Sequence, residues 1–250
     1  MRVDLPAAYG FLLLIFRAAA LCMSAPLLGM RGVPMRSRMA LATVVAAVAF
    51  SGAGYPHADV PGTFLGLGAQ AMAETVMGLC AGLSARIILD AAQTAGQLAG
   101  TSMGFGFGAL LDPVNGTEST MLGQLFSWVT IGVAVALGIH REALGWLALS
   151  VHQVPPGTVD GLGTLAQGVV VQSIYAVTLA IRLGLPLLAA VTFGHAVLGI
   201  MGRAAPQIQI SSVGFAVAIL AGGTAVYALL PHIAHITAQA ALRTFHGQPG

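Results

Sequence analysis

The chain has 250 residues, of which 57% are hydrophobic and only 7% are charged, and its formal net charge at pH 7 is +2. Soluble domains carry about a quarter charged residues, so this chain has too few charges to cover a soluble core with a polar surface. The composition predicts an integral membrane protein. The small net charge does not favour a nucleic-acid partner, and we expect none.

Six long apolar segments follow one another along the chain and are expected to be helices, because backbone polar groups inside a bilayer must be hydrogen-bonded within their own segment. They are predicted at about 7–28, 39–51, 64–100, 121–139, 165–203 and 212–230. Gly/Pro-rich turns separate them. The first is expected to be a retained membrane segment and not a signal peptide, because Asp4 and Arg17 interrupt the pattern of a leader.

The lengths of these segments are unusual for a regular bundle. At 1.5 Å per residue, 39–51 reaches only about 20 Å, whereas the hydrocarbon core is roughly 30 Å thick. The runs 64–100 and 165–203 would each exceed about 55 Å if straight, and Pro186 is expected to kink the second. The segment 142–154 and the tail 231–245 are each either interfacial helices or ordinary helix ends. The lengths therefore argue against six regular spans.

Glycine makes up 33 of the 250 residues, and several glycines recur at four-residue spacing. Small residues at this spacing let membrane helices approach closely. One pair is Gly78 and Gly82, and a longer predicted packing face consists of Gly96, Gly100, Gly104 and Gly108. The pattern indicates tight helix assembly.

A few charged residues stand within or beside apolar segments, where such groups usually face a partner or an aqueous cavity. They are Arg17, Glu74, Arg86, Asp90 and Arg182. Arg86 and Asp90 are four residues apart, so they could pair on one helix face in a structural or a functional role. Glu74, Arg86, Asp90 and Arg182 could also line the route of a proton-coupled or solute transporter, although no clear internal repeat supports one.

Residue patterns for catalysis and ligand binding are weak throughout the chain. His232 and His235 are a close pair without a third ligand nearby, so we expect no metal site. The run GFGFG at 104–108 lacks the spacing and the strand of a dinucleotide fingerprint. Cys22 and Cys80 lie in apolar runs and are expected to be packing residues. We expect neither a cofactor nor an enzyme.

Five stretches carry a resemblance that spans nearly the whole chain. They are APLLGMRGVPMRSRMALA at 25–42, AETVMGLCAGL at 73–83, AGQLAGTSMGFGFGALLDPVNGTESTMLG at 95–123, LGIHREAL at 137–144 and LPLLAAVTFGHAVLGIMGRAAPQIQISSVGFAVAILAGG at 185–223. In this order and separation they resemble the FliR family of flagellar export-gate proteins, whose injectisome counterparts are called SctT. The most specific parts are the AGQ…MG…DP…G…S run and the GRAAPQ…GF run.

The resemblance implies a non-enzymatic subunit of the type III export gate in the bacterial inner membrane, at the flagellar basal body. The implied partners are FliP-like and FliQ-like subunits, an FlhB-like switch protein, exported polypeptides in transit and membrane lipid. The implied fold is all-α with bent helical hairpins: a FliP-like part at 1–160 and a FliQ-like hairpin with a C-terminal tail at 161–250. The cytoplasmic tip of that hairpin would hold Arg203, Pro206 and Gln207. A flagellar role is favoured over an injectisome role.

The same resemblance places the segment 103–116, MGFGFGALLDPVNG, at a secretion channel. Glycines give its backbone freedom, and apolar side chains can dewet a constriction, so we expect it to help seal the channel. The sealing residues would be Met103, Phe105, Phe107, Leu110 and Leu111, with Asp112 and Pro113 as the loop anchor. The alternative is that these residues only pack helix against helix. A separate hypothesis for the whole chain is a plain membrane scaffold, which predicts that a pull-down recovers partners and that no mutation changes permeability.

Overall fold

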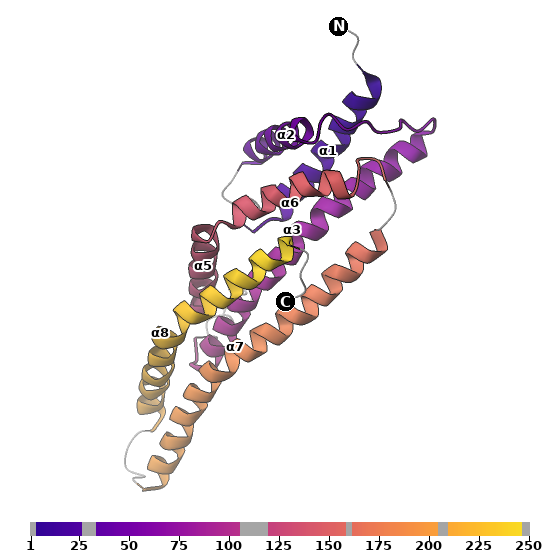
Figure 1. Ribbon diagram of the computed structural model, residues 1–250. Coiled ribbons are helices and arrows are strands. Elements are labelled where there is room, and N and C mark those ends of the chain that lie inside the picture. Colours follow the sequence, from indigo (N-terminus) through magenta and orange to yellow (C-terminus); the bar gives the residue numbers. More distant parts are fainter. Residues whose placement is uncertain (1–3, 27–33, 106–119, 159–161, 205–209, 247–250) are drawn as a thin grey trace. The chain divides into compact units, whose positions relative to one another are not determined.

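Helices account for every regular element in the part of the chain that the computed structural model describes, which is residues 4–26, 34–105, 120–158, 162–204 and 210–246 (Figure 1). The helices are α1 (Leu5–Ser24), α2 (Met35–Gly52), α3 (Phe64–Ser102), α5 (Met121–Ala136), α6 (Ile139–Gln153), α7 (Leu162–Ala204) and α8 (Ile210–Phe245). In these ranges α1, α3, α7 and α8 are long and apolar enough to cross a bilayer, and the broken pair α5 and α6 could make a fifth span. The predicted all-α membrane protein is confirmed.

The chain divides into two compact units that alternate along the sequence. Unit 1 comprises residues 1–87, 135–174 and 240–250, and unit 2 comprises 88–134 and 175–239. The long helices α3, α7 and α8 each contribute to both units. The predicted FliP-like part at 1–160 and the FliQ-like hairpin with its tail at 161–250 stay a prediction.

Unit 1 is built around close contacts of α1 with its neighbours. A Cβ atom added at Gly78 of α3 would collide with the backbone carbonyl of Arg17, and one added at Gly82 would collide with the Ser24 side chain. The later glycine of α3 meets the later residue of α1, so the two helices run parallel here. This pair of glycines therefore brings two helix backbones together, as small residues do in membrane interfaces.

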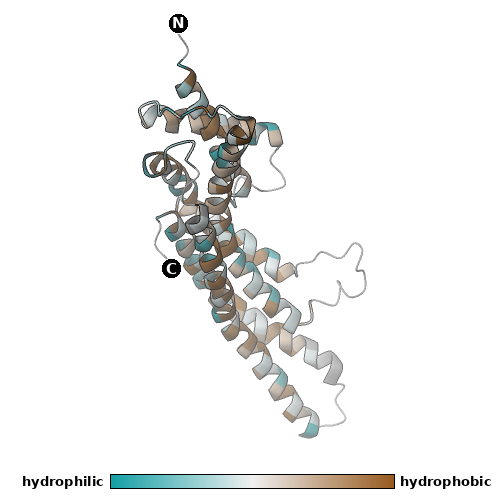
Figure 2. Cartoon of the chain, turned by 90° about the vertical axis from the view of Figure 1, so that its right-hand side faces the viewer, coloured by the Kyte–Doolittle hydropathy of each residue, from teal (hydrophilic) through white to brown (hydrophobic). Residues whose placement is uncertain are grey.

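Unit 2 contains a buried apolar cluster to which four helices contribute, α3, α5, α7 and α8. Its members are Ala92, Ala99, Met103, Phe126, Leu187, Val191, Val226 and Ile233. In this unit α7 and α8 run antiparallel, since Gly194 lies near Ala221 and Leu198 near Gly214. The expected C-terminal helix pair is present. The helices of the chain are coloured largely white to brown by residue hydropathy, with teal at scattered positions (Figure 2).

Several helices are longer than the apolar runs that predicted them. α2 begins at Met35, four residues before the expected start, and has 18 residues. α8 continues through Pro231 to Phe245, so the tail is the end of that helix and not a separate one. α7 continues through Pro186, where the expected kink stays a prediction. A proline removes one intrahelical hydrogen bond, and the long helical segments on both sides keep theirs.

Candidate functional site

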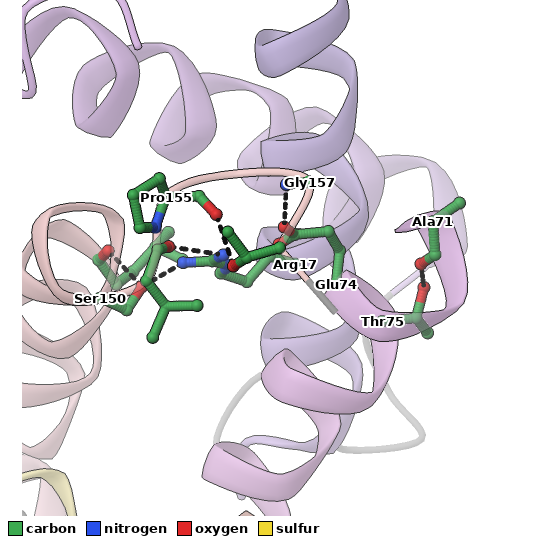
Figure 3. A network of polar contacts seen from close by, with 10 residues as sticks. Arg17, Ala71, Glu74, Thr75, Ser150, Pro155 and Gly157 are labelled. Atoms are coloured by element: carbon green, nitrogen blue, oxygen red, sulfur yellow. Dashed lines mark hydrogen bonds and ion pairs between the residues drawn. The ribbon is translucent and has the colours of Figure 1, made fainter. Parts of the chain in front are cut away.

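The most strongly buried polar group in unit 1 is an ion pair between α1 and α3. Arg17 and Glu74 are both fully buried, and the Arg17 Nε atom lies 2.6 Å from Glu74 Oε2 (Figure 3). The two residues are 57 positions apart in the sequence. Charges removed from water require such a partner, because an uncompensated ion in an apolar environment costs several kcal/mol.

The remaining donors of Arg17 reach the C-terminal end of α6 and the turn after it. Its Nη1 atom donates to Ser150 Oγ at 3.0 Å, and its Nη2 atom donates to the Val154 carbonyl oxygen at 3.1 Å. Ser150 is itself buried and donates to the Leu147 carbonyl at 2.7 Å. A guanidinium has several donors in one plane, so a single arginine can bind a carboxylate and two further acceptors.

Glu74 binds the same turn from the other side. Its Oε1 atom accepts a hydrogen bond from the Gly157 backbone N–H at 3.0 Å. Gly157 has φ +92°, a left-handed conformation that favours glycine, and its N–H points toward the carboxylate (Figure 3). One turn before Glu74, Gln70 accepts a hydrogen bond from the Tyr9 hydroxyl at 2.7 Å. The arginine and the glutamate therefore fasten α1, α3 and the turn 154–157 together.

We call the ion pair and its hydrogen bonds to Ser150, Val154 and Gly157 the brace, because they connect α1, α3 and the turn 154–157. Both charged side chains are fully buried, and their further partners are two backbone groups and one hydroxyl. The other charged residues of the predicted transporter route, Arg86, Asp90 and Arg182, occupy exposed positions on α3 and α7. Pairing of Arg86 with Asp90 stays a prediction.

The sequence alone singled out Arg17 and Glu74 as charges in apolar segments but did not pair them. The sequence did contain an indication of this pairing, because opposite charges on two separate apolar helices are most stable when they contact each other. Ser150, Val154 and Gly157 were not identified as site residues. Their contribution is made by backbone groups and one hydroxyl, which carry no distinctive sequence pattern.

In unit 2, the predicted glycine face leads to a close contact between α3 and α5. A Cβ atom at Gly96 would lie 2.8 Å from the Phe126 ring and 2.9 Å from the Leu122 carbonyl oxygen, and one at Gly100 would lie 2.7 Å from Thr120 Oγ1. All three distances are shorter than real Cβ atoms show, so a side chain at either position would force its neighbour to shift. Gly104 lies beyond the end of α3, with φ +92°.

Met103, the first residue of the proposed sealing segment, lies inside the apolar cluster of unit 2. Its side chain is 2% exposed, and it fills the space beside Gly222 of α8, where a Cβ atom would collide with it. Phe105, two residues later, is 39% exposed. Met103 thus packs between helices here, while Phe105 reaches the surface.

The remaining predicted residues are placed as follows. Arg203 is exposed in the last turn of α7. Residues outside the described ranges are Phe107, Gly108, Leu110, Leu111, Asp112, Pro113, Pro206 and Gln207. Among the residues that the structure describes, no three His, Cys, Asp or Glu side chains come close enough together to hold a metal ion. Cys22 and Cys80 are free thiols.

A helical membrane chain with this order of motifs can be compared with known proteins. A family model described as bacterial export proteins, family 1, matches residues 8–244. The chain belongs to this family. The resemblance to FliR that the motifs predicted is confirmed, and the brace and the glycine face are features of an export-family protein.

Relatives with curated names agree with the family match. The flagellar biosynthetic protein FliR of Escherichia coli K12 is 28% identical over 223 residues, which cover 88% of this chain and 84% of that protein. FliR of Bacillus subtilis 168 is 28% identical over 210 residues, covering 82% and 79%. FliR of Caulobacter vibrioides is 24% identical over 214 residues, covering 84% of both chains. The matched regions therefore cover about four fifths of each of these relatives.

Proposed function

We propose that this chain is a non-enzymatic subunit of the flagellar type III protein export gate in the bacterial inner membrane. The observation that carries the proposal is the family match, which extends over residues 8–244 and leaves only short termini uncovered. Relatives named flagellar biosynthetic protein FliR favour a flagellar over an injectisome role. The long apolar helices fit residence in a membrane.

In this proposal the chain forms the entry of the secretion channel together with FliP-like and FliQ-like subunits, and an FlhB-like protein lies against it. Large apolar side chains that the isolated chain leaves open to solvent support the presence of such neighbours. Examples are Phe64 at 94%, Leu65 at 86% and Tyr227 at 86% exposure. Exposed apolar surface of this kind is covered by lipid or by protein in the native setting.

Copurification tests this part of the proposal. An affinity-tagged full chain, extracted from membranes in mild detergent, should recover FliP-like, FliQ-like and FlhB-like chains. Recovery of the chain alone as a stable oligomer would refute the assignment. Cells that lack the chain should lose flagella and swimming, whereas retained swimming with lost effector secretion would instead assign it to an injectisome.

The segment 103–116 is proposed to seal the channel when no substrate is in transit. Because Met103 is buried in the unit 2 core, it would fix the point at which the segment leaves α3. Phe105 would then be the first side chain available to a constriction, followed by Phe107. Apolar rings in a narrow opening exclude water and therefore ions.

Ionic conductance across membranes that contain the assembled gate tests the seal. Changing Phe105 and Phe107 to serine should raise the conductance of the resting gate, because hydroxyl side chains let the constriction wet. A matched control is Phe64→Ser, which alters an exposed phenylalanine at the start of α3. The control should conduct like the parent. If the variant with serine at Phe105 and Phe107 also conducts like the parent, the segment only packs and does not seal.

A further inference from the structure

Unit 1 contains an apolar groove that the export function leaves unassigned. It runs between α2 and α6 and consists of two adjoining cavities of about 240 and 420 Å³. Both cavities are lined by Val45 of α2 and Leu144 of α6, so they form one continuous feature. The end of α1 and Phe245 of α8 close one side of the first cavity.

The groove has the length and chemistry of an alkyl-chain site. Along α2 its lining extends from Leu41 to Ala53, which at 1.5 Å per residue is about 18 Å. One leaflet of the hydrocarbon core is roughly 15 Å deep, so a single acyl chain has a matching length. The side chains along the groove are almost entirely aliphatic, with a histidine at each end, His140 and His152.

Two arginines precede the groove-lining residues of α2. Arg36 and Arg38 lie in the first turn of α2, and α2 contains no acidic residue. Arg38 precedes Leu41 by three positions and Val45 by seven, a spacing that places it on the groove-lining face of the helix. An apolar groove with two arginines just beyond its end is complementary to an anionic amphiphile.

We propose that this groove binds one anionic phospholipid, with an acyl chain between α2 and α6 and the phosphate near Arg36 and Arg38. Arginines next to a membrane segment attract anionic headgroups by about 1 kcal/mol each. A partner helix fits less well. A helix about 11 Å across is much wider than a single alkyl chain, so only one of its faces could enter the groove, and it would have to carry an acid near the two arginines.

Lipid retention tests the proposal on the full chain, purified in mild detergent with whatever subunits accompany it. Mass spectrometry of the intact assembly and of its extracted lipids should detect phosphatidylglycerol that persists through detergent washing. Ala148→Phe, which fills the groove from α6, should reduce this retention at least about tenfold, as expected for removing a buried chain of several methylene groups. Its matched control is Ala47→Phe, an exposed alanine of α2 outside the groove.

The charge contribution is tested separately with the double variant Arg36→Gln and Arg38→Gln. Preference for phosphatidylglycerol over phosphatidylcholine should fall by about fivefold per arginine. The control Arg203→Gln removes an exposed arginine at another helix terminus and should leave the preference unchanged. If the control loses as much of its preference for phosphatidylglycerol, the preference comes from general attraction between arginines and anionic lipid, and the headgroup assignment is overturned.

A labelling experiment keeps the proposal testable if the filled variant fails to fold. Phosphatidylglycerol with a photoreactive group on its acyl chain should label residues of α2 and α6 in the unmodified protein. Labelling confined to other helices would overturn the proposal. So would a photoreactive amino acid at Leu144 that crosslinks to another protein subunit and not to lipid.

Discussion

Removing the negative charge of Glu74 should destabilise unit 1 severely. Glu74→Gln keeps an oxygen that can accept from the Gly157 N–H, and it keeps nearly the same volume. It leaves the Arg17 guanidinium buried without its counter-ion, although the contacts to Ser150 and Val154 remain. The variant therefore keeps the packing and the hydrogen bond to the turn, and it removes the counter-ion of Arg17 together with the acceptor of the Arg17 Nε–H.

The expected magnitude follows from the burial of both partners. Breaking a fully buried ion pair by neutralising one member costs about 3–5 kcal/mol, which shifts the folding equilibrium roughly a hundredfold to several thousandfold. Removing both charges, with Arg17→Met and Glu74→Gln together, should recover about 1–3 kcal/mol of this loss. The recovery is incomplete because Ser150 and Val154 then lose their donor.

The assay is SDS-induced unfolding of the full chain in mild detergent, followed by helical circular dichroism. Glu142→Gln serves as the matched control, because Glu142 lies in a partly exposed pair with His246 at 3.2 Å. Surface pairs contribute at most about 1 kcal/mol, so this control should unfold close to the parent. A Glu74→Gln variant as stable as the control would refute the brace. A double variant no more stable than Glu74→Gln would refute the account based on uncompensated charge.

Two further substitutions test close packing, and a third tests a buried hydroxyl. Gly78→Ala should destabilise the chain by about 1–3 kcal/mol, since its Cβ would collide with the α1 backbone, whereas Gly68→Ala on the same helix has open space and should change stability by less than about 1 kcal/mol. Gly222→Ala should lower the unfolding midpoint, because its Cβ would displace Met103. Met103→Ala leaves a cavity of its own, so the double variant should lose less stability than the sum of the two single losses; purely additive losses would argue against their contact. Thr130→Val should raise stability by about 1 kcal/mol, because the buried Thr130 hydroxyl has no hydrogen-bond partner among the described residues, and a lower unfolding midpoint would contradict this.

Most of the helices could be predicted from the sequence, because the backbone of an apolar run in a membrane must satisfy its own hydrogen bonds and therefore forms a helix. The start of α3 at Phe64 follows the predicted segment, whereas the predicted segment 121–139 runs across the break at Gly138 that separates α5 from α6. The continuation of α8 through Pro231 was one of the two alternatives for the tail 231–245. Proline ends helices in soluble proteins more often than in membranes, where neighbouring groups compensate for the lost bond.

The sequence by itself determined the membrane class, most of the helical segments, the export family and a set of five charged residues within or beside apolar segments. Only the tertiary structure decided that Arg17 and Glu74 satisfy one another, because pairing across 57 residues depends on how α1 lies against α3. It also decided that Met103 is buried beside Gly222 while Phe105 reaches the surface. Neighbouring residues in a segment share composition and periodicity, but burial is set by the helices that come to lie against each side chain.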